Sequence, residues 1–253
     1  MIVDLLKNIA RKCKRIILRI RFFLTVNWLK TIYFNFKMLP FEQARKLPFI
    51  FYGKIYFSSL KGKVKINVPI KMGLVCFGED FEINKKAKGI AQLHLDGEAV
   101  FNGYMHIGKD VLFYVNDGAY CEFGNMACLG SNVRFVCMNK ISLGNWTGIG
   151  YDSQLLDSNF HPMYNTLTNE EYPMHGVIQL GDHNAVSNRV TIQSGTITNN
   201  NFVIASNSLC NANYYNLGEN VLIGGVPAKL IKNNFARNWE IEKESLMKFK
   251  IKW

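Results

Sequence analysis

The chain has 253 residues, 48% of them hydrophobic and 19% charged, and this balance excludes an intrinsically disordered protein. Its net charge of +11 is concentrated in residues 1–65, which hold 15 of the 30 lysines and arginines but only two of the 19 acidic residues. A nucleic-acid-binding domain spreads its cations over the folded surface, so this uneven distribution argues against nucleic acid as a partner.

The N-terminal segment, residues 1–63, is predicted to lie outside the main domain. Within it, residues 1–35 have apolar side chains at steps of three and four and basic side chains on the other side, as in an amphipathic helix. Such a helix can lie in an anionic membrane interface, where each basic residue contributes about 1 kcal/mol. It can equally pack on the protein's own body or on a partner subunit, and both alternatives stay open.

The sequence shows none of the usual signs of export. Arginine and lysine interrupt every apolar run near the N-terminus before it reaches the length of a signal peptide's hydrophobic region. No stretch approaches the ~20 uncharged residues that span a bilayer. The six cysteines form no C-x-x-C pair and have no spacing typical of a zinc knuckle or a disulfide framework. These patterns predict a cytoplasmic protein, with any membrane contact made at the inner face of the cytoplasmic membrane through residues 1–35.

Residues 64–231 are predicted to form the main domain, because a repeat runs through them. Apolar residues recur at six-residue intervals, and glycine often follows each one. Three six-residue rungs make one triangular coil, in which the apolar residue of each rung points inward and stacks on its equivalent in the next coil. Glycine and asparagine suit the corners, where the chain turns, often with a positive φ. The apolar–glycine pairs include Ile107-Gly108, Phe123-Gly124, Leu129-Gly130, Leu143-Gly144, Ile149-Gly150 and Leu180-Gly181.

This repeat predicts a mainly β protein, a left-handed parallel β-helix, followed by a short C-terminal helix within residues 232–253. The alternative, a β-sandwich, would show strict alternation with turns every ~8–12 residues and no six-residue phase. The phase slips between Phe113 and Cys121 and again at 135–141, so irregular early coils are expected. It breaks completely at residues 157–177, which predicts an extruded loop, and long loops inside compact repeats are usually functional.

Four segments resemble the hexapeptide-repeat acyltransferases. The run Ile223-Gly-Gly-Val-Pro-Ala-Lys229 is similar to the motif that closes the β-helix of that family, and residues 180–195 look like its penultimate coil. The segment Asp157-Ser-Asn-Phe-His161 resembles the loop that carries the family's catalytic histidine. Residues 27–40 resemble the leader of members that acetylate surface or capsular polysaccharides. The β-helical part of the resemblance covers about residues 95–232.

The resemblance implies a homotrimer with active sites between neighbouring β-helices. Acetyl-CoA lies in the cleft there, and the loop of one subunit reaches across it. The implied reaction moves an acetyl group to a sugar hydroxyl of a surface polysaccharide or its precursor. Asn188 and Ser206 are expected along the pantetheine, and Lys229 at the nucleotide phosphates. Departures from the family's usual residues at Ala185, Ser187 and 205–207 leave the acyl-chain length and the CoA contacts open.

His161 is the predicted general base, because histidine can accept and return a proton near neutral pH. Asp157 is the nearest carboxylate in the loop that could fix the tautomer of the imidazole, and the alternative for it is a solvated loop acid. Two other histidines, His94 and His106, are expected on different faces of the coil. His175 lies at the end of the loop, where it could contact the acceptor, and the corner residue His183 is expected to face solvent.

Other functions are weighed against O-acetylation. The acceptor could be an amino-sugar nitrogen, since either chemistry needs a base. A zinc enzyme such as a γ-type carbonic anhydrase needs three convergent imidazoles, which the histidine spacing does not supply, so no metal is expected. A non-catalytic β-helical scaffold recruited to the membrane would have no affinity for CoA.

Overall fold

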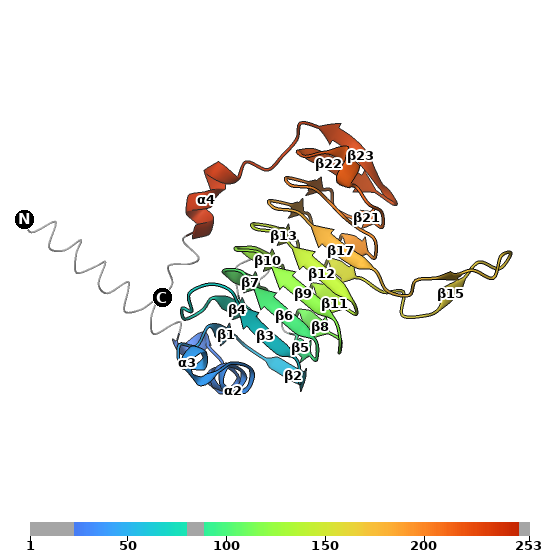
Figure 1. Cartoon of the computed structure of the whole chain (residues 1–253). Coiled ribbons are helices and arrows are strands. Elements are labelled where there is room, and N and C mark those ends of the chain that lie inside the picture. The colour runs from blue at the N-terminus through green and yellow to red at the C-terminus, as the bar shows by residue number, and fades with distance from the viewer. Residues whose placement is uncertain (1–22, 80–88, 248–253) are drawn as a thin grey trace, which may run out of the picture.

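The computed structural model describes residues 23–79 and 89–247, and in this range the chain winds into a column of stacked coils (Figure 1). Three strands per coil run along three flat faces, and strands in successive coils pair in parallel. The fold class predicted from the repeat, a left-handed parallel β-helix, is confirmed. None of the helices within the described ranges has the length and apolar character needed to cross a bilayer.

Each face of the column is one sheet. The first face contains β1 (Phe49–Phe51), β4 (Val75–Phe77), β7 (Met105–Ile107), β10 (Ala127–Leu129), β13 (Gly148–Ile149), β18 (Ala185–Val186), β20 (Val203–Ile204), β22 (Val221–Gly225) and β23 (Ala228–Asn233). The second contains β2 (Ile55–Leu60), β5 (Ala91–Leu95), β8 (Leu112–Val115), β11 (Arg134–Cys137), β14 (Gln154–Leu156), β19 (Thr191–Gln193) and β21 (Leu209–Cys210). The third contains β3 (Lys63–Ile66), β6 (Glu98–Phe101), β9 (Tyr120–Phe123), β12 (Lys140–Leu143) and β17 (Val177–Leu180).

The coils differ in length, which explains why the sequence repeat slips. Thr191 on the second face pairs with Leu209, which lies 18 residues further along the chain, the length of one coil of three six-residue rungs. Earlier coils on the same face are longer, since Leu112 pairs with Arg134 and Arg134 with Gln154. These wider coils hold aromatic side chains, and Phe113 stacks on Phe135 with their ring centroids 4.8 Å apart. The core of these longer coils is rich in phenylalanine, whereas the core of the later coils is mainly aliphatic and includes Phe202.

Glycine has the positive φ predicted for corner residues at some turns, as at Gly118 and Gly195 between the second and third faces, but not at others. In the first corner, between the first and second faces, residues with positive φ recur once per coil at Asp110, Asn132, Asp152, Arg189 and Asn207. Gly124 and Gly181, which follow the inward apolar residues, have no such φ. They are required because a Cβ at either position would lie 2.4 Å or 2.6 Å from the backbone of the next coil. At this corner polar side chains thus occupy the left-handed turns, and the glycines after the inward residues permit the close stacking of coils.

The β-helix begins earlier than the predicted boundary at residue 64, because β1, β2 and β3 already form its first coil. The helices α2 (Trp28–Met38) and α3 (Phe41–Ala44) precede it, while residues 1–22 of the predicted amphipathic helix lie outside the described residues. At the other end, β23 continues to Asn233, and α4 (Trp239–Met247) is the helix predicted within 232–253.

Helix α2 covers the open edge of the first face. The buried Asn35 side chain accepts a hydrogen bond from the Phe49 amide and donates one to its carbonyl, at 3.1 and 2.7 Å. Thr31 Oγ1 accepts from the Phe51 amide at 3.1 Å, and Phe34 packs its ring on both phenylalanines. An uncovered edge strand is a template for unwanted pairing, so this helix is part of the folded body.

Candidate active site

The segment 157–177 leaves the column at the second corner, between β14 on the second face and β17 on the third. It forms a hairpin of two short antiparallel strands, β15 (Met163–Tyr164) and β16 (Glu171–Tyr172), that projects away from the column (Figure 1). A rigid solenoid thus presents a loop that has no place in its own core. The loop has the position that the break in the repeat predicted.

Asp157 lies at the base of this loop and is fully buried. Its two carboxylate oxygens accept hydrogen bonds from the backbone amides of Met138 and Asn139, at 2.7 and 2.9 Å. Its backbone carbonyl accepts from the Gly176 amide at 2.8 Å, and the Asn139 side chain donates to the Gly176 carbonyl. Asp157 therefore joins both ends of the loop to the coil beneath. This anchoring role differs from the two considered from the sequence, a carboxylate that orients the imidazole and a solvated loop acid.

His161 lies just before the hairpin and is exposed. The preceding residue, Phe160, has a φ of 62°, so the chain turns sharply there. Within the described part of a single chain, the His161 side chain makes no hydrogen bond or ion pair, and none links it to Asp157. An imidazole held out on a loop in this way is available to a substrate or to a neighbouring subunit.

His175, on the returning side of the loop, has a partner in the same chain. Its Nδ1 lies 2.8 Å from the Ser158 hydroxyl, which also accepts a hydrogen bond from the Phe160 amide at 2.9 Å. Ser158 and His175 also form an antiparallel bridge. This network fixes the turn that carries His161, so His175 contributes to the shape of the loop.

The three residues predicted to bind the donor lie on one edge of the column. The Ser206 hydroxyl donates a hydrogen bond to Asn188 Oδ1 at 2.7 Å, because the two residues are equivalent positions of consecutive coils at the first corner. Lys229 is exposed on β23 and pairs with Gly224 on β22. The Ala205 amide donates to the Ile223 carbonyl at 2.9 Å, so Gly224 lies beside the same corner.

The loop and the donor edge belong to different corners of one chain. His161 departs from the second corner, whereas Asn188 and Ser206 line the first corner. The second face, which carries β14 and β19, separates them. A single chain therefore does not bring the predicted base and the predicted donor residues together.

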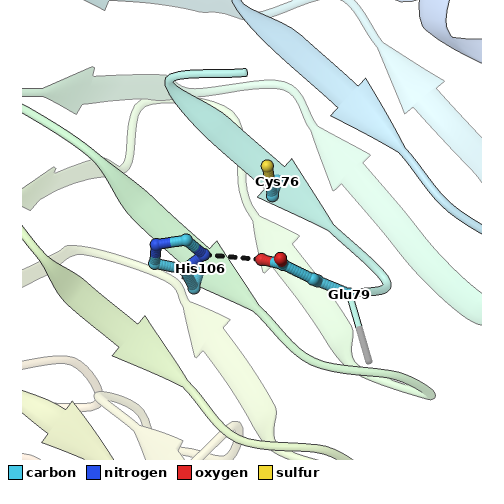
Figure 2. A group of neighbouring side chains, drawn as sticks. All are labelled: Cys76, Glu79 and His106. Carbon is cyan, nitrogen blue, oxygen red and sulfur yellow. Dashed lines mark hydrogen bonds and ion pairs between the residues drawn. The ribbon is translucent and has the colours of Figure 1, made fainter. Parts of the chain in front are cut away.

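His94 and His106 lie on different faces, as predicted. His106 is on β7 of the first face, beside Cys76 and Glu79 (Figure 2). His94 is on β5 of the second face and stacks on Tyr114 with ring centroids 4.1 Å apart. His183 has the left-handed φ expected at a corner, but it is half-buried because Trp239 packs edge-on against its ring.

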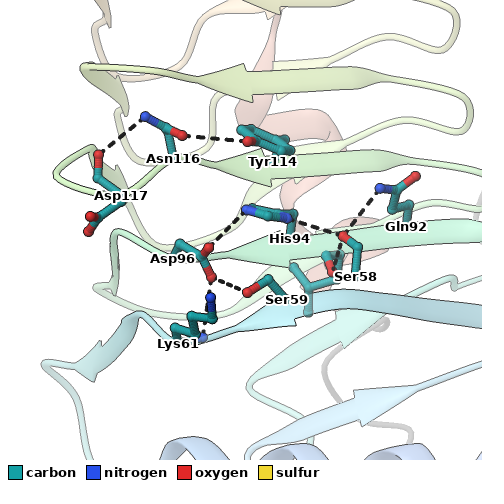
Figure 3. Close-up of polar contacts among 10 residues, drawn as sticks. Ser58, Ser59, Lys61, Gln92, His94, Asp96, Tyr114, Asn116 and Asp117 are labelled. Carbon is teal, nitrogen blue, oxygen red and sulfur yellow. Dashed lines mark hydrogen bonds and ion pairs between the residues drawn. The ribbon is translucent and has the colours of Figure 1, made fainter.

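A polar network surrounds His94 (Figure 3). Its Nδ1 lies 3.3 Å from the Ser58 hydroxyl and its Nε2 lies 3.2 Å from Asp96. Asp96 also accepts a short hydrogen bond from the Ser59 hydroxyl, which holds the pKa of that carboxyl below its usual range. The Ser58 hydroxyl accepts from Gln92 Nε2 at 3.2 Å, so the network ties β2 to β5. The two-residue spacing of His94 and Asp96 along an extended chain predicts that both side chains point to the same side of the sheet. Ser58 lies in another coil, so no local sequence pattern links it to this pair.

No protein-family model matches the chain. The sequence is 27% identical over 201 residues to an uncharacterized 24.8 kDa protein in the cps region of Klebsiella pneumoniae, covering 79% of this chain and 86% of that protein. It is 26% identical over 175 residues to the putative lipopolysaccharide biosynthesis O-acetyl transferase WbbJ of Escherichia coli (strain K12), covering 66% of this chain and 77% of the relative.

Two similar solved structures are acetyltransferases. The polySia specific acetyltransferase NeuO is 16% identical, with a TM-score of 0.46 and coverage of 80% of this chain and 98% of that one. A hexapeptide-repeat containing acetyltransferase of Vibrio cholerae O1 biovar eltor, complexed with acetyl coenzyme A, is 20% identical with a TM-score of 0.38. That match covers 45% of this chain and 60% of the other.

Proposed function

We propose that this protein transfers an acetyl group from acetyl-CoA to a hydroxyl of a surface polysaccharide or its precursor, with His161 as the general base. The observation that carries the proposal is the exposed His161 on a loop that the β-helix extrudes and Asp157 anchors. The sequence similarity to WbbJ, named as an O-acetyl transferase of lipopolysaccharide biosynthesis, supports the substrate class.

The reaction needs only one proton carrier. His161 takes the proton of the sugar hydroxyl as its oxygen attacks the thioester carbonyl, so a C–O bond forms. The C–S bond then breaks as the tetrahedral intermediate collapses. The protonated imidazole gives its proton to the departing CoA sulfur, which leaves a neutral histidine for the next cycle. Asp157 acts as a positioning residue in this scheme, because its oxygens are occupied by backbone amides.

The complete site is proposed to form between subunits of a homotrimer. A loop at the second corner can reach donor residues at the first corner only if the two corners belong to neighbouring chains. Exposed apolar side chains on the loop fit this assembly, since such a concentration on one surface commonly marks an interface. They are Phe160, Met163, Tyr164, Leu167 and Tyr172, and Leu167 is 92% exposed in the single chain.

Acetyl-CoA is expected to stabilise the protein against heat, by about 2.7 kcal/mol at 100 times its Kd. A thermal shift titration with acetyl-CoA, followed by an assay of free CoA thiol release over a panel of sugar and amino-sugar acceptors, tests the proposed function. The absence of any shift at saturating acetyl-CoA would leave only a non-catalytic scaffold. Release of thiol with amino sugars alone would change the reaction to N-acetylation.

Lys229→Ala is expected to raise the KM for acetyl-CoA about tenfold, equivalent to 1.4 kcal/mol, with a smaller effect on kcat. The reason is the loss of a cation proposed to contact the nucleotide phosphates. Lys232→Ala is the matched control, because Lys232 lies on the same strand but its ammonium faces the Phe235 ring at 5.4 Å. Equal KM values for the two variants would remove Lys229 from the donor site.

The acceptor is proposed to be lipid-linked, at the cytoplasmic face of a membrane. Helices α2 and α3 expose a row of apolar side chains beside the lysines of α2, a combination that suits an anionic interface. They are Leu29, Ile32, Tyr33, Phe36 and Phe41, and Leu29 is 84% exposed. The basic residues of 1–35 supply further cations to the same end of the chain.

Leu29→Ser combined with Phe36→Ser is expected to lower partition into anionic phospholipid vesicles roughly tenfold, because two apolar contacts are lost. Co-sedimentation at low and high salt measures this. Serine at the exposed residues Leu230 and Ile231, at the other end of the column, is the control. Deleting residues 1–35 is a poorer test, since it removes Phe34, which caps the first coil. Unchanged partition together with an altered oligomeric state would assign the α2 surface to a subunit interface instead.

A further inference from the structure

A cluster of three chemically different side chains lies on the outer side of the first face (Figure 2). Cys76 is on β4 and His106 is on β7, while Glu79 is the second residue after the end of β4. One ligand atom from each residue lies within 4.8 Å of the other two. All three residues are buried, with exposed fractions of 2%, 8% and 5% in the order named. None of them takes part in the proposed acetyl transfer.

The backbone brings these residues together. Cys76 and His106 are direct partners in the parallel pairing of β4 and β7, so their side chains leave neighbouring strands on the same side. Gly78, with a φ of 79°, turns the chain after β4, and the Gly78 and Glu79 amides both donate to the Ile107 carbonyl. This turn places the Glu79 carboxylate over β7, where it lies 2.6 Å from His106 Nδ1.

Other parts of the chain cover the cluster. Val26 and Ile50 pack with Cys76 in a small hydrophobic core outside the column, and Trp28 and Tyr52 border it. Carboxylates are rarely buried to this degree unless a cation or hydrogen bonds compensate for the lost water.

We propose that Cys76, Glu79 and His106 bind a zinc ion. Thiolate, imidazole and carboxylate are the three protein ligands that Zn²⁺ uses, whereas Mg²⁺ and Ca²⁺ take oxygen ligands. Zinc bonds of about 2.0–2.3 Å set tetrahedral ligand atoms roughly 3.3–3.8 Å apart, so small side-chain rotations close this cluster around the ion. The ion replaces the proton of the Cys76 thiol, which passes to solvent, while His106 binds as a neutral imidazole and Glu79 as a carboxylate.

With three protein ligands and water in the fourth tetrahedral position, the zinc ion has a structural role in this proposal. It links the coil of β4 to the coil of β7 near the N-terminal end of the column, on the face opposite the corner from which the loop of His161 departs. The γ-type carbonic anhydrase considered from the sequence needs three histidines, and this ligand set is different. The proposal does not rest on acetyl transfer, since the pairing of β4 with β7 and the turn at Gly78 hold the ligands.

Zinc content of the purified full-length protein, after dialysis against a weak chelator, tests the proposal. About one zinc per chain is expected in the wild type and in Cys210→Ser, a control variant whose buried thiol is on β21 of the second face. Cys76→Ser, Glu79→Gln and His106→Gln are each expected to bind at least tenfold more weakly, since a ligand is lost. Full retention of zinc in Cys76→Ser, or no zinc in a wild type incubated with it, overturns the assignment.

Cobalt provides a readout that remains valid if a variant folds poorly. Wild-type protein stripped of metal and titrated with Co²⁺ is expected to show a thiolate-to-cobalt charge-transfer band in the near ultraviolet and an upward shift of Tm. Zinc should displace the cobalt with loss of the band. A titration of the stripped wild type that leaves both the absorbance and the Tm unchanged contradicts the proposal, whether or not the enzyme transfers acetyl groups.

Discussion

His161→Ala is expected to lower kcat about 10²–10⁴-fold, because a positioned general base contributes that much to a transfer that begins with removal of a hydroxyl proton. The KM for acetyl-CoA should change little, since Asn188, Ser206 and Lys229 are the residues proposed to hold the donor. The assay follows release of the CoA thiol with the best acceptor from the screen. Binding of acetyl-CoA, measured by thermal shift, should remain, which separates a lost base from a lost site.

Thr166→Ala is the control for this variant, because Thr166 is exposed on the same loop, carries no titratable group and is not among the apolar side chains assigned to the subunit interface. Its rate should stay within a few-fold of the wild type if the loop keeps its shape. A near-normal rate in His161→Ala would move the base elsewhere, first to His175. The hydrogen bond of His175 to Ser158 makes that residue a positioning group in the present scheme, so His175→Gln should preserve most of the activity.

The fold could be predicted because each coil repeats the same physical requirement. Inward apolar residues and glycines that permit close stacking leave a regular trace in the later coils, where β18, β19, the bridge residue Ile197 and β20 follow one another at steps of about six residues. The first coil was missed because β1 and β2 are separated from their partners by longer segments and show no six-residue phase. The partnership of Asn35 with Phe49 depends on tertiary structure, so α2 and β1 look like unrelated segments in the sequence.

The candidate site was predictable to the extent that it interrupts the repeat. His161 lies in the longest break, and a resemblance supplied its role. The donor residues Asn188 and Ser206 are one coil apart, which is why they meet. The cluster of Cys76, Glu79 and His106 left no such signal, because 30 residues separate the cysteine from the histidine and the coil between them is far longer than the repeat.

Asp157→Ala is expected to destabilise the protein by about 2–4 kcal/mol and to reduce activity, because it leaves the amides of Met138 and Asn139 without their buried acceptor. Asp157→Asn should fall between the wild type and the alanine variant. Its side-chain oxygen can still accept from one amide, but its NH₂ group faces the other amide as a second donor. Urea unfolding and thiol release at several temperatures measure the two effects.

The order of these variants distinguishes anchoring from catalysis. If Asp157 only holds the two ends of the loop, the loss of activity should follow the loss of stability, and cooling the assay should restore part of the rate. The KM for the acceptor should rise with the mobility of the loop, and the pH dependence of kcat should keep its shape.

If Asp157→Asn were as inactive as His161→Ala at unchanged stability, the carboxylate would act on the imidazole. Rearrangement in the trimer would then have to release an acid that is fully buried and doubly hydrogen-bonded in the single chain. Breaking the two hydrogen bonds of this buried carboxylate costs several kcal/mol, so anchoring is the role that the geometry favours.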